Sequence, residues 1–219
     1  MIQGSDIAAV FFPGQSVRPI LFVLLLVTGP TSLGAQWRVT ALSGSATSHG
    51  DARNDADPAR PEFHADRPRT LTAAISRDLG AWRIGLEGRN ATAALTEAGR
   101  AVAVTTFGVF EAWGTGLELG RRLAGGRAMP GLYAGLGIGV DRWTLSGAPA
   151  RWRSAARGAL EADFPVARGW SAVLRGEVTA SPSVFTATDL PEGFAQHAYY
   201  RIGLVVGVAR GTATRNRNK

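Results

Sequence analysis

The sequence has no cysteine, a single lysine and no apolar stretch long enough to form a membrane-spanning helix. The absence of cysteine excludes a disulfide, a thiolate metal site and a cysteine nucleophile. The apolar run over residues 20–27 falls well short of the roughly 20 residues that a spanning helix needs, and the mean hydropathy is only +0.02. These absences exclude a bundle of membrane helices but not a barrel of amphipathic strands, in which polarity alternates along each strand.

Positive charge comes almost entirely from arginine, because Lys219 is the only lysine. The formal net charge is +7 and the isoelectric point is about 11.1. Arginine dominance reflects either a genome-wide base composition or a use in bidentate binding of phosphate and carboxylate groups. The arginines are scattered at strand spacing and are not interleaved with stacking aromatic residues, so we do not expect the protein to bind nucleic acid.

The N-terminal segment has the features of a secretory signal peptide. Arg18 precedes the apolar run, and the small residues Gly34 and Ala35 indicate cleavage before Gln36. We therefore expect residues 1–35 to direct export through a Sec-type route and to be removed. Because residues 1–16 form an unusual prefix to such a signal, a translation start near Val17 is a further hypothesis.

Most of the remaining sequence alternates between apolar residues and small or charged ones, which is the period-2 pattern of β-strands. The alternation is clear over residues 131–141 and 199–210. Further strands are expected at residues 37–47, 69–77, 82–89, 157–164 and 170–179, with another ending over residues 113–119. Loops are expected over residues 48–68, 92–101, 121–130, 144–152 and 182–196.

This pattern predicts an all-β fold, a closed antiparallel up-and-down transmembrane β-barrel of about eight strands. The barrel would occupy residues 36–210 and be followed by a basic tail over residues 211–219. Tilted strands need about 9–11 residues to cross a bilayer. Long connections at one end and short ones at the other are typical of outer-membrane barrels.

Aromatic residues indicate which face of the sheet is outside. Trp37, Trp82 and Trp170 lie on the apolar face, and each begins a strand that runs in the same direction, so they should meet at one rim with Phe164. Such a rim resembles the aromatic girdle of a membrane barrel. A soluble lipocalin-like carrier, with its apolar face inward around an apolar ligand, is the alternative that alternation alone leaves open.

The opposite face carries small residues and long charged ones, a mixture that suits the narrow lumen of an eight-stranded barrel. Six arginines and six acids face this lumen, so we predict an internal ion-pair network and a polar, plugged interior. The twelve residues are Arg38, Arg83, Glu87, Arg89, Glu118, Asp141, Arg157, Glu161, Asp163, Arg175, Glu177 and Arg201.

On these features the chain resembles the small eight-stranded outer-membrane β-barrels of Gram-negative-type bacteria, such as the OmpA transmembrane domain, OmpX and OmpW. The resemblance is one of architecture and covers nearly all of the chain from Trp37 to Arg210. It implies location in the outer membrane, delivery by the outer-membrane assembly machinery, a monomer, no cofactor, and a structural or surface-interaction role. The sequence departs from that family in lacking a terminal aromatic residue on its last strand.

Histidines and acids in the expected long loops are candidates for a metal or hydrolase site. His49, His64 and His197 have nearby acids, but metal-ligand spacing such as HxxxH or HExxH is absent. No histidine is followed by a serine in the His-x-Ser arrangement that would be expected if the chain resembled the barrel deacylases. We therefore assign no catalytic residue and no metal ligand, although a lipid A- or phospholipid-modifying enzyme stays an alternative function.

Arginines near the long-loop end could contact anionic lipid, including lipopolysaccharide, through their phosphate groups. Ordinary solvation at the rim would explain these residues equally well. The residues are Arg67, Arg69, Arg142, Arg151 and Arg153.

Overall fold

The computed structural model describes residues 37–49, 52–55, 62–98, 103–125, 129–145 and 149–211. The expected signal peptide and all but the first residue of the expected basic tail lie outside these residues. Within the described part of the chain, no helix is both long and apolar enough to cross a membrane.

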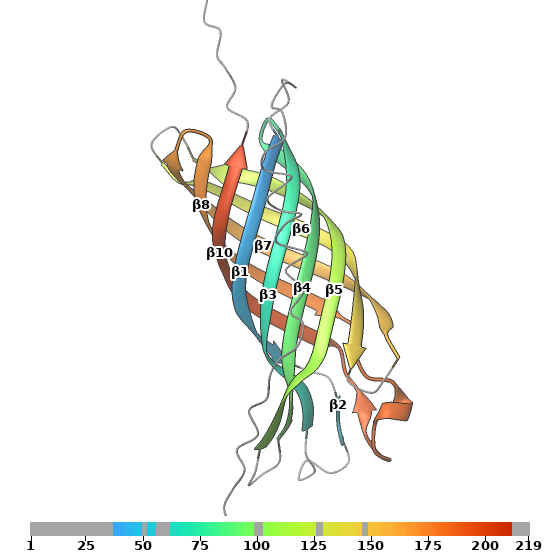
Figure 1. Ribbon diagram of the computed structural model, residues 1–219. Helices are drawn as coiled ribbons and strands as arrows, with labels where there is room; N and C mark the ends of the chain where they lie inside the picture. Colours follow the sequence, from blue (N-terminus) through green and yellow to red (C-terminus); the bar gives the residue numbers. More distant parts are fainter. Residues whose placement is uncertain are drawn as a thin grey trace, which may run out of the picture. The chain divides into compact units, whose positions relative to one another are not determined.

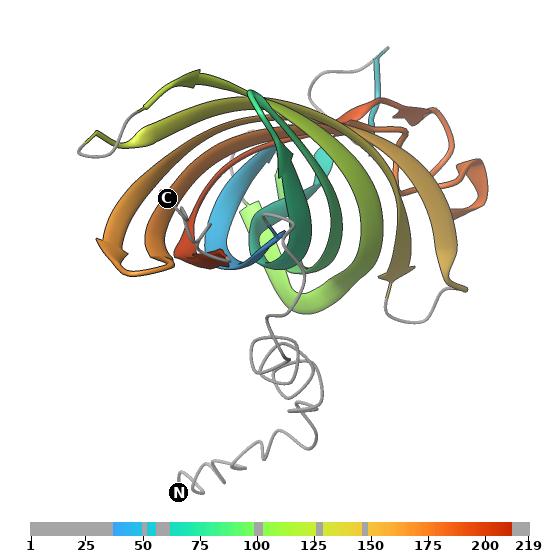
Figure 2. The same cartoon turned by 90° about the horizontal axis from the view of Figure 1, so that it is seen from above.

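Eight long antiparallel strands form a closed barrel, as the alternating pattern predicts (Figure 1). They are β1 (Trp37–His49), β3 (Glu62–Leu79), β4 (Trp82–Ala98), β5 (Ala103–Ala124), β6 (Gly131–Leu145), β7 (Arg151–Ala167), β8 (Trp170–Ser181) and β10 (Tyr199–Gly211). The barrel closes because β1 pairs with both β10 and β3. The strands curve around a shared interior in the view from above (Figure 2).

The two ends of the barrel differ in their connections. At the short-turn rim, Leu79 pairs with Trp82 and Ala167 pairs with Trp170, so two residues join the strands in each case. Gly80 and Gly169 adopt φ values of 67° and 76° in these turns, a conformation that glycine tolerates because it has no Cβ. β1 begins and β10 ends at this rim (Figure 1).

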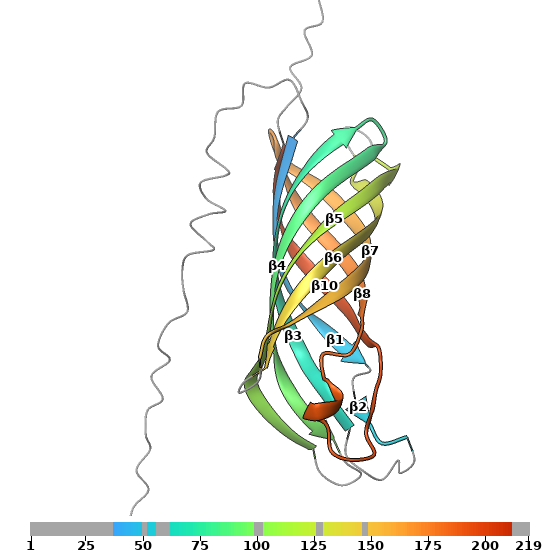
Figure 3. The same cartoon turned by 90° about the vertical axis from the view of Figure 1, so that its right-hand side faces the viewer.

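The long-loop rim holds the remaining elements: β2 (Ala52–Arg53), β9 (Ala195–Gln196) and the 3-10 helix η1 (Ala187–Asp189). Figure 3 shows β2 and the η1 segment at this end of the barrel. β2 pairs with β3 on one side and with β9 on the other, which ties two long connections to the wall.

Apolar side chains point outward over most of the wall. Leu136 and Ile138 on β6 are 75% and 70% exposed, whereas Asp141 on the same strand is 1% exposed. The same alternation holds on β10, where Ile202 and Leu204 are exposed and Arg201 is buried. The outer wall is therefore apolar and the lumen is charged, which is the orientation that a membrane barrel requires.

Several strands are longer than the sequence predicts. The loop expected over residues 92–101 is wrong, because β4 continues to Ala98 and pairs there with Ala103 of β5. The loop expected over residues 48–68 is wrong in part, because β2 lies within it and β3 begins at Glu62. Small residues such as Ala91 and Ala93 face inward in the extended hairpin. Because alanine differs little in polarity from its neighbours there, the segment shows no clear alternation in the sequence.

Candidate functional site: the barrel lumen

The lumen near the short-turn rim contains a compact group of ion pairs. Arg38 forms a bidentate pair with Asp163, with Nη1 2.6 Å from Oδ2 and Nη2 2.5 Å from Oδ1. Arg83 donates from Nη1 to Glu161 at 2.8 Å and from Nε to Asp78 at 2.8 Å. These charge-assisted forks fix both the position and the orientation of the carboxylates.

Aromatic packing supports the same group. The guanidinium carbon of Arg83 lies 3.8 Å from the ring centroid of Tyr133, within the range of a cation–π contact. Arg122 donates from Nε to the hydroxyl of Tyr133 at 3.1 Å. Tyr133 therefore holds the arginine side chain from the wall of β6.

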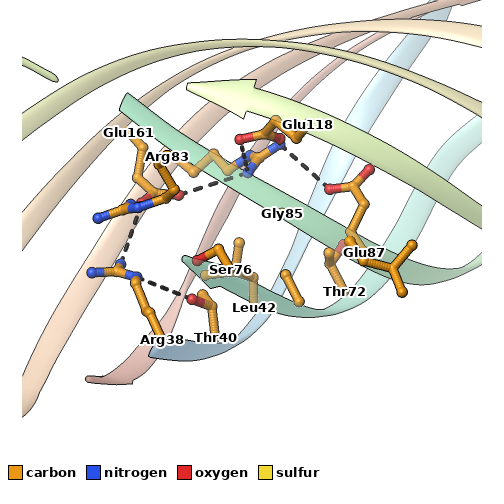
Figure 4. Close-up of a pocket in the computed structure, with 13 residues that line it drawn as sticks. Arg38, Thr40, Leu42, Thr72, Ser76, Arg83, Gly85, Glu87, Glu118 and Glu161 are labelled. Atoms are coloured by element: carbon orange, nitrogen blue, oxygen red, sulfur yellow. Dashed lines mark hydrogen bonds and ion pairs between the residues drawn. The ribbon is translucent and has the colours of Figure 1, made fainter. Parts of the chain in front are cut away.

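Arg175 links the lower and middle lumen. It hydrogen-bonds to Glu118 and lies within 3.6–3.7 Å of carboxylate oxygens of Glu87, Glu161 and Glu177. Figure 4 shows Glu118, Glu87 and Glu161 around this part of the lumen, with Arg38 and Arg83 beside Glu161. The cavity between them has a volume of about 30 Å³, enough to admit a water molecule.

Arg157 is the centre of the upper ion pairs. Its Nη1 lies 2.5 Å from Oε1 of Glu87, and its Nη2 lies 2.6 Å from Oδ1 of Asp141. Arg201 approaches the other oxygen of Asp141 at 3.4 Å, and Arg89 lies 3.6 Å from Glu177. Carboxylates with several cationic neighbours each can stay ionised in a narrow lumen.

Glycines in the wall make the space that Arg157 occupies. A Cβ atom on Gly139 would come within 3.0 Å of Arg157 Nη1, and one on Gly114 within 3.3 Å of Nη2 and 3.0 Å of Asp141 Cγ. The glycines on β5 and β6 therefore allow a long side chain to lie flat against the backbone.

An aromatic cluster closes the lumen above these ion pairs, toward the long-loop rim. Its fully buried rings are Trp143, Tyr199 and Phe110, and Phe185 enters it from the connection between β8 and β9. Trp143 packs edge-on against both Tyr199 and Phe110, at centroid distances of 5.6 Å and 6.3 Å. The sequence pattern did not predict this cluster, and Phe185 lies within residues 182–196, which were expected to form a loop.

All twelve residues of the predicted ion-pair network face the lumen, and each lies within 3.6 Å of an oppositely charged member of that set. One participant was not predicted: Asp78 binds Arg83 from the turn-proximal end of β3. Many of the pairing partners come from strands that are not neighbours, which alternation along single strands does not reveal.

The four girdle residues Trp37, Trp82, Trp170 and Phe164 lie on the outer wall by the short-turn rim. Trp37 and Trp82 are 39% and 47% exposed, and strand register places Trp170 opposite Arg210 at the end of β10. A second set of outward indoles, Trp113 and Trp152, lies nearer the long-loop rim, where both are paired across strands with Arg142. The sequence pattern did not predict that second set.

The arginines considered for lipid contact fall into two groups. Arg67, Arg69 and Arg142 are exposed. Arg151 instead forms a bidentate pair with Asp189 of η1, at 2.5 Å and 2.7 Å, and Arg153 donates to the backbone carbonyl of Ser183 at 2.7 Å. These two arginines hold the connection between β8 and β9 against the wall.

Asp189 is held ionised by this arrangement. Burial, the largest single influence, raises the pKa of its carboxyl, but hydrogen bonds from Arg151 and from the backbone and hydroxyl of Thr186 outweigh it, so the pKa lies below its ordinary value of 3.8. The connection is therefore clamped by a charged contact at neutral pH.

The histidines are not arranged as a catalytic or metal centre in the described residues. His197 lies 3.2 Å from Asp55, and a hydrogen bond from Arg53 lowers the pKa of that aspartate. His49 is exposed, and the side chain of His64 is not described. In this part of the chain, no three His, Asp or Glu side chains gather as a metal site would need.

No family model and no curated protein matches the chain. Among solved structures it is similar to neisserial surface protein A, at 9% identity and a TM-score of 0.49, covering 81% of this chain and 97% of that chain. It is also similar to Ail, the attachment invasion locus protein of Yersinia pestis, at 14% identity and 0.36, covering 78% and 97%. The outer membrane protein AlkL matches at 11% identity and 0.39, covering 97% and 100%.

The fold follows from the geometry of this chain. Eight antiparallel strands close on themselves, apolar side chains cover the outside, and charged side chains fill the inside. In a bilayer such closure satisfies every backbone hydrogen bond within the wall. The chain has the fold of a small transmembrane β-barrel of the bacterial outer-membrane type.

Proposed function

We propose that this protein is an outer-membrane β-barrel whose lumen is plugged by its own side chains, with a structural or surface-interaction role and no function as a wide pore. The observation that supports this most strongly is the series of ion pairs from Arg38 at one end to Arg201 at the other. An eight-stranded interior is just wide enough for side chains to fill it.

The energetics of the lumen oppose passage of a solute. A solute crossing it would have to separate pairs such as Arg157–Glu87 and Arg157–Asp141, whose members are only 2–4% exposed. Breaking one partner away from a buried pair costs about 3–5 kcal/mol. Above those pairs the aromatic cluster around Trp143 would also have to move.

Outer-membrane lipids, including lipopolysaccharide, are the proposed partners of the outer wall, and the assembly machinery is the proposed route of insertion. Exposed apolar side chains such as Leu136 and Ile202 would contact acyl chains. Because the barrel is closed, a monomer leaves no sheet edge with unpaired backbone groups.

Two measurements test this proposal. The unboiled protein should migrate differently from the boiled protein in SDS gels and should fractionate with the outer membrane. In planar bilayers the wild-type barrel should give no steady conductance of the size expected for an open channel, whereas a variant with E87A, D141A and R157A together should leak. The outward variant L136A is the matched control. A steady open conductance from the wild-type protein would refute the plugged lumen.

A further inference from the structure

Three tryptophans on the outer wall at the short-turn rim each have an arginine beside the indole ring. The guanidinium carbon lies 5.9 Å, 5.5 Å and 5.4 Å from the ring centroid in the three cases. The pairs are Trp37 with Arg77, Trp82 with Arg121, and Trp170 with Arg210. We call these six residues the Trp–Arg collar.

The strand register produces all three pairs in the same way. In each pair the tryptophan begins a strand, and the arginine lies directly opposite it near the end of a neighbouring strand. The pairs belong to β1–β3, β4–β5 and β8–β10, so they are distributed around the rim. Residues directly opposite across an antiparallel ladder are close enough for their side chains to interact.

The collar is a cationic surface. Within the described residues, no carboxylate forms an ion pair with Arg77 or Arg121. The acids nearest to them in sequence and register do not face outward: Asp78 is paired with Arg83 at 2.8 Å, and Glu118 is paired with Arg175 in the lumen. The charges of Arg77 and Arg121, both exposed, are therefore directed outward at this rim.

Stacking gives these cations a defined depth and orientation. Indole rings prefer the headgroup region of a bilayer, and a guanidinium held beside a ring keeps its planar donor fork available for a second partner. Phosphate is the partner that this fork matches, because two parallel N–H groups can bind two of its oxygens. An apolar wall and a fixed donor at headgroup level together match a phospholipid, with acyl chains on the wall and phosphate at the fork.

At the long-loop rim Trp113 and Trp152 lie opposite Arg142 in the register, but within the described residues no guanidinium lies beside either indole ring as it does in the collar. There the indole of Trp113 donates its Nε1–H to Glu111 at 2.8 Å, so an acid accompanies the aromatic residue. A carboxylate in that place repels a phosphate group. The two rims of the molecule therefore differ in what accompanies their tryptophans. This difference distinguishes the collar from arginines that are merely solvated at a rim.

We propose that the Trp–Arg collar binds phosphate headgroups of glycerophospholipids in the periplasmic leaflet, with a preference for anionic lipids such as phosphatidylglycerol. The assignment of this rim to the periplasm follows from its short turns, and the proposal rests on the proposed function as an outer-membrane barrel. The collar residues differ from the arginines considered for lipid contact at the long-loop rim. The guanidinium fork of each collar arginine would bind one lipid.

The test uses the full chain folded in nanodiscs of phosphatidylcholine mixed with phosphatidylglycerol. Native mass spectrometry after release from the disc gives the number and class of lipids retained. The variant R77Q/R121Q/R210Q removes the collar charges, and R67Q/R69Q/R142Q is the matched control with the same loss of charge at the other rim. Each basic residue close to a membrane surface strengthens the binding of anionic lipid. We therefore expect the collar variant to bind phosphatidylglycerol at least about tenfold more weakly than the wild type.

The control variant should retain phosphatidylglycerol as the wild type does. Equal retention by the collar variant and the wild type would overturn the proposal, and so would a loss confined to the control variant. W82L keeps Arg121 but removes the stacking partner of this one pair, so selectivity for phosphatidylglycerol over phosphatidylcholine should fall. Unchanged selectivity in W82L would refute the role of stacking.

Heat-dependent gel migration is recorded for every variant. Failure of the wild type to show that shift would refute the membrane barrel itself, whereas a shift together with unselective lipid retention would refute the collar alone. If the triple variant does not fold, R121Q and R77Q are measured singly, and each should still lower phosphatidylglycerol retention.

Discussion

Replacing Arg157 with methionine is the sharpest test of the ion-paired lumen. Methionine is flexible and can occupy much of the space of the arginine stem, so the substitution removes the charge without leaving a large cavity. Two carboxylates lose their shortest contacts: Glu87 at 2.5 Å and Asp141 at 2.6 Å. Both acids then remain buried with only their more distant arginine neighbours.

The magnitude follows from burial and from the remaining partners. The side chain of Arg157 is 3% exposed and that of Glu87 is 4% exposed, so water screens the pair very little. Removing one partner of a buried pair costs about 3–5 kcal/mol. Arg89 and Arg175 stay 3.5 Å and 3.6 Å from Glu87 and recover part of the loss. We expect the free energy of unfolding to fall by about 3 kcal/mol, or about a hundredfold in the folding equilibrium.

The assay is reversible urea unfolding in lipid vesicles, followed by gel migration and tryptophan emission. A double-mutant cycle between R157M and E87Q should give a coupling energy of about 1–3 kcal/mol. The control cycle pairs R157M with R38M, whose ion-pair partners are different acids, and should be additive within about 0.5 kcal/mol. A loss below about 1 kcal/mol for R157M, or a coupling near zero with E87Q, would refute a tightly paired lumen.

Two further predictions concern the glycine cradle and the outer clamp. G114A should lower the free energy of unfolding by about 1–3 kcal/mol, because its Cβ would overlap the carboxylate of Asp141. G88A is the control: no atom lies within 4 Å of the added Cβ, so its free energy of unfolding in the same urea titration should equal that of the wild type. Since the pKa of Asp189 is lowered in the folded protein, the stabilising clamp to Arg151 is complete above the ordinary pKa of 3.8 and is lost as the pH falls through that lowered value. Protection of residues 182–196 from hydrogen exchange, taken relative to the intrinsic exchange rate at each pH, should fall in that acid range, and D189N should show the lower protection already at neutral pH; protection that does not change with pH in the wild type would contradict the clamp.

The alternating sequence pattern was sufficient to predict the barrel and to divide the residues of each strand between the two faces of its wall. A period of two assigns neighbouring residues to opposite faces, so the pattern by itself places Arg201 and Leu204 on different faces. The large polarity contrast between such residues makes the pattern unambiguous. The outward orientation of the apolar face also followed from the position of Trp37, Trp82 and Trp170.

The partners of each lumen charge could not be predicted in the same way. Arg157 and Glu87 are separated by 70 residues and lie on β7 and β4, which are not neighbouring strands. Their contact crosses the lumen and depends on the stagger of the closed sheet. The same stagger decides that Arg77 lies opposite Trp37, which is why the Trp–Arg collar is invisible in the linear sequence.

Polarity reverses along single strands, and the reversal identifies the surroundings of each part of the wall. On β5 the outward residues Leu117 and Leu119 are exposed and apolar, whereas nearer the long-loop rim the exposed residue is Glu111 and its neighbour Phe110 is buried. A soluble carrier would keep its apolar residues inside along the whole strand, and a strand wholly within lipid would keep them outside throughout. Only a wall that leaves the bilayer and continues into water needs both arrangements, because each section must bury its apolar side chains away from water. The change occurs around Trp113, which places one membrane surface at that indole and explains why an aromatic core lies above an ion-paired lumen.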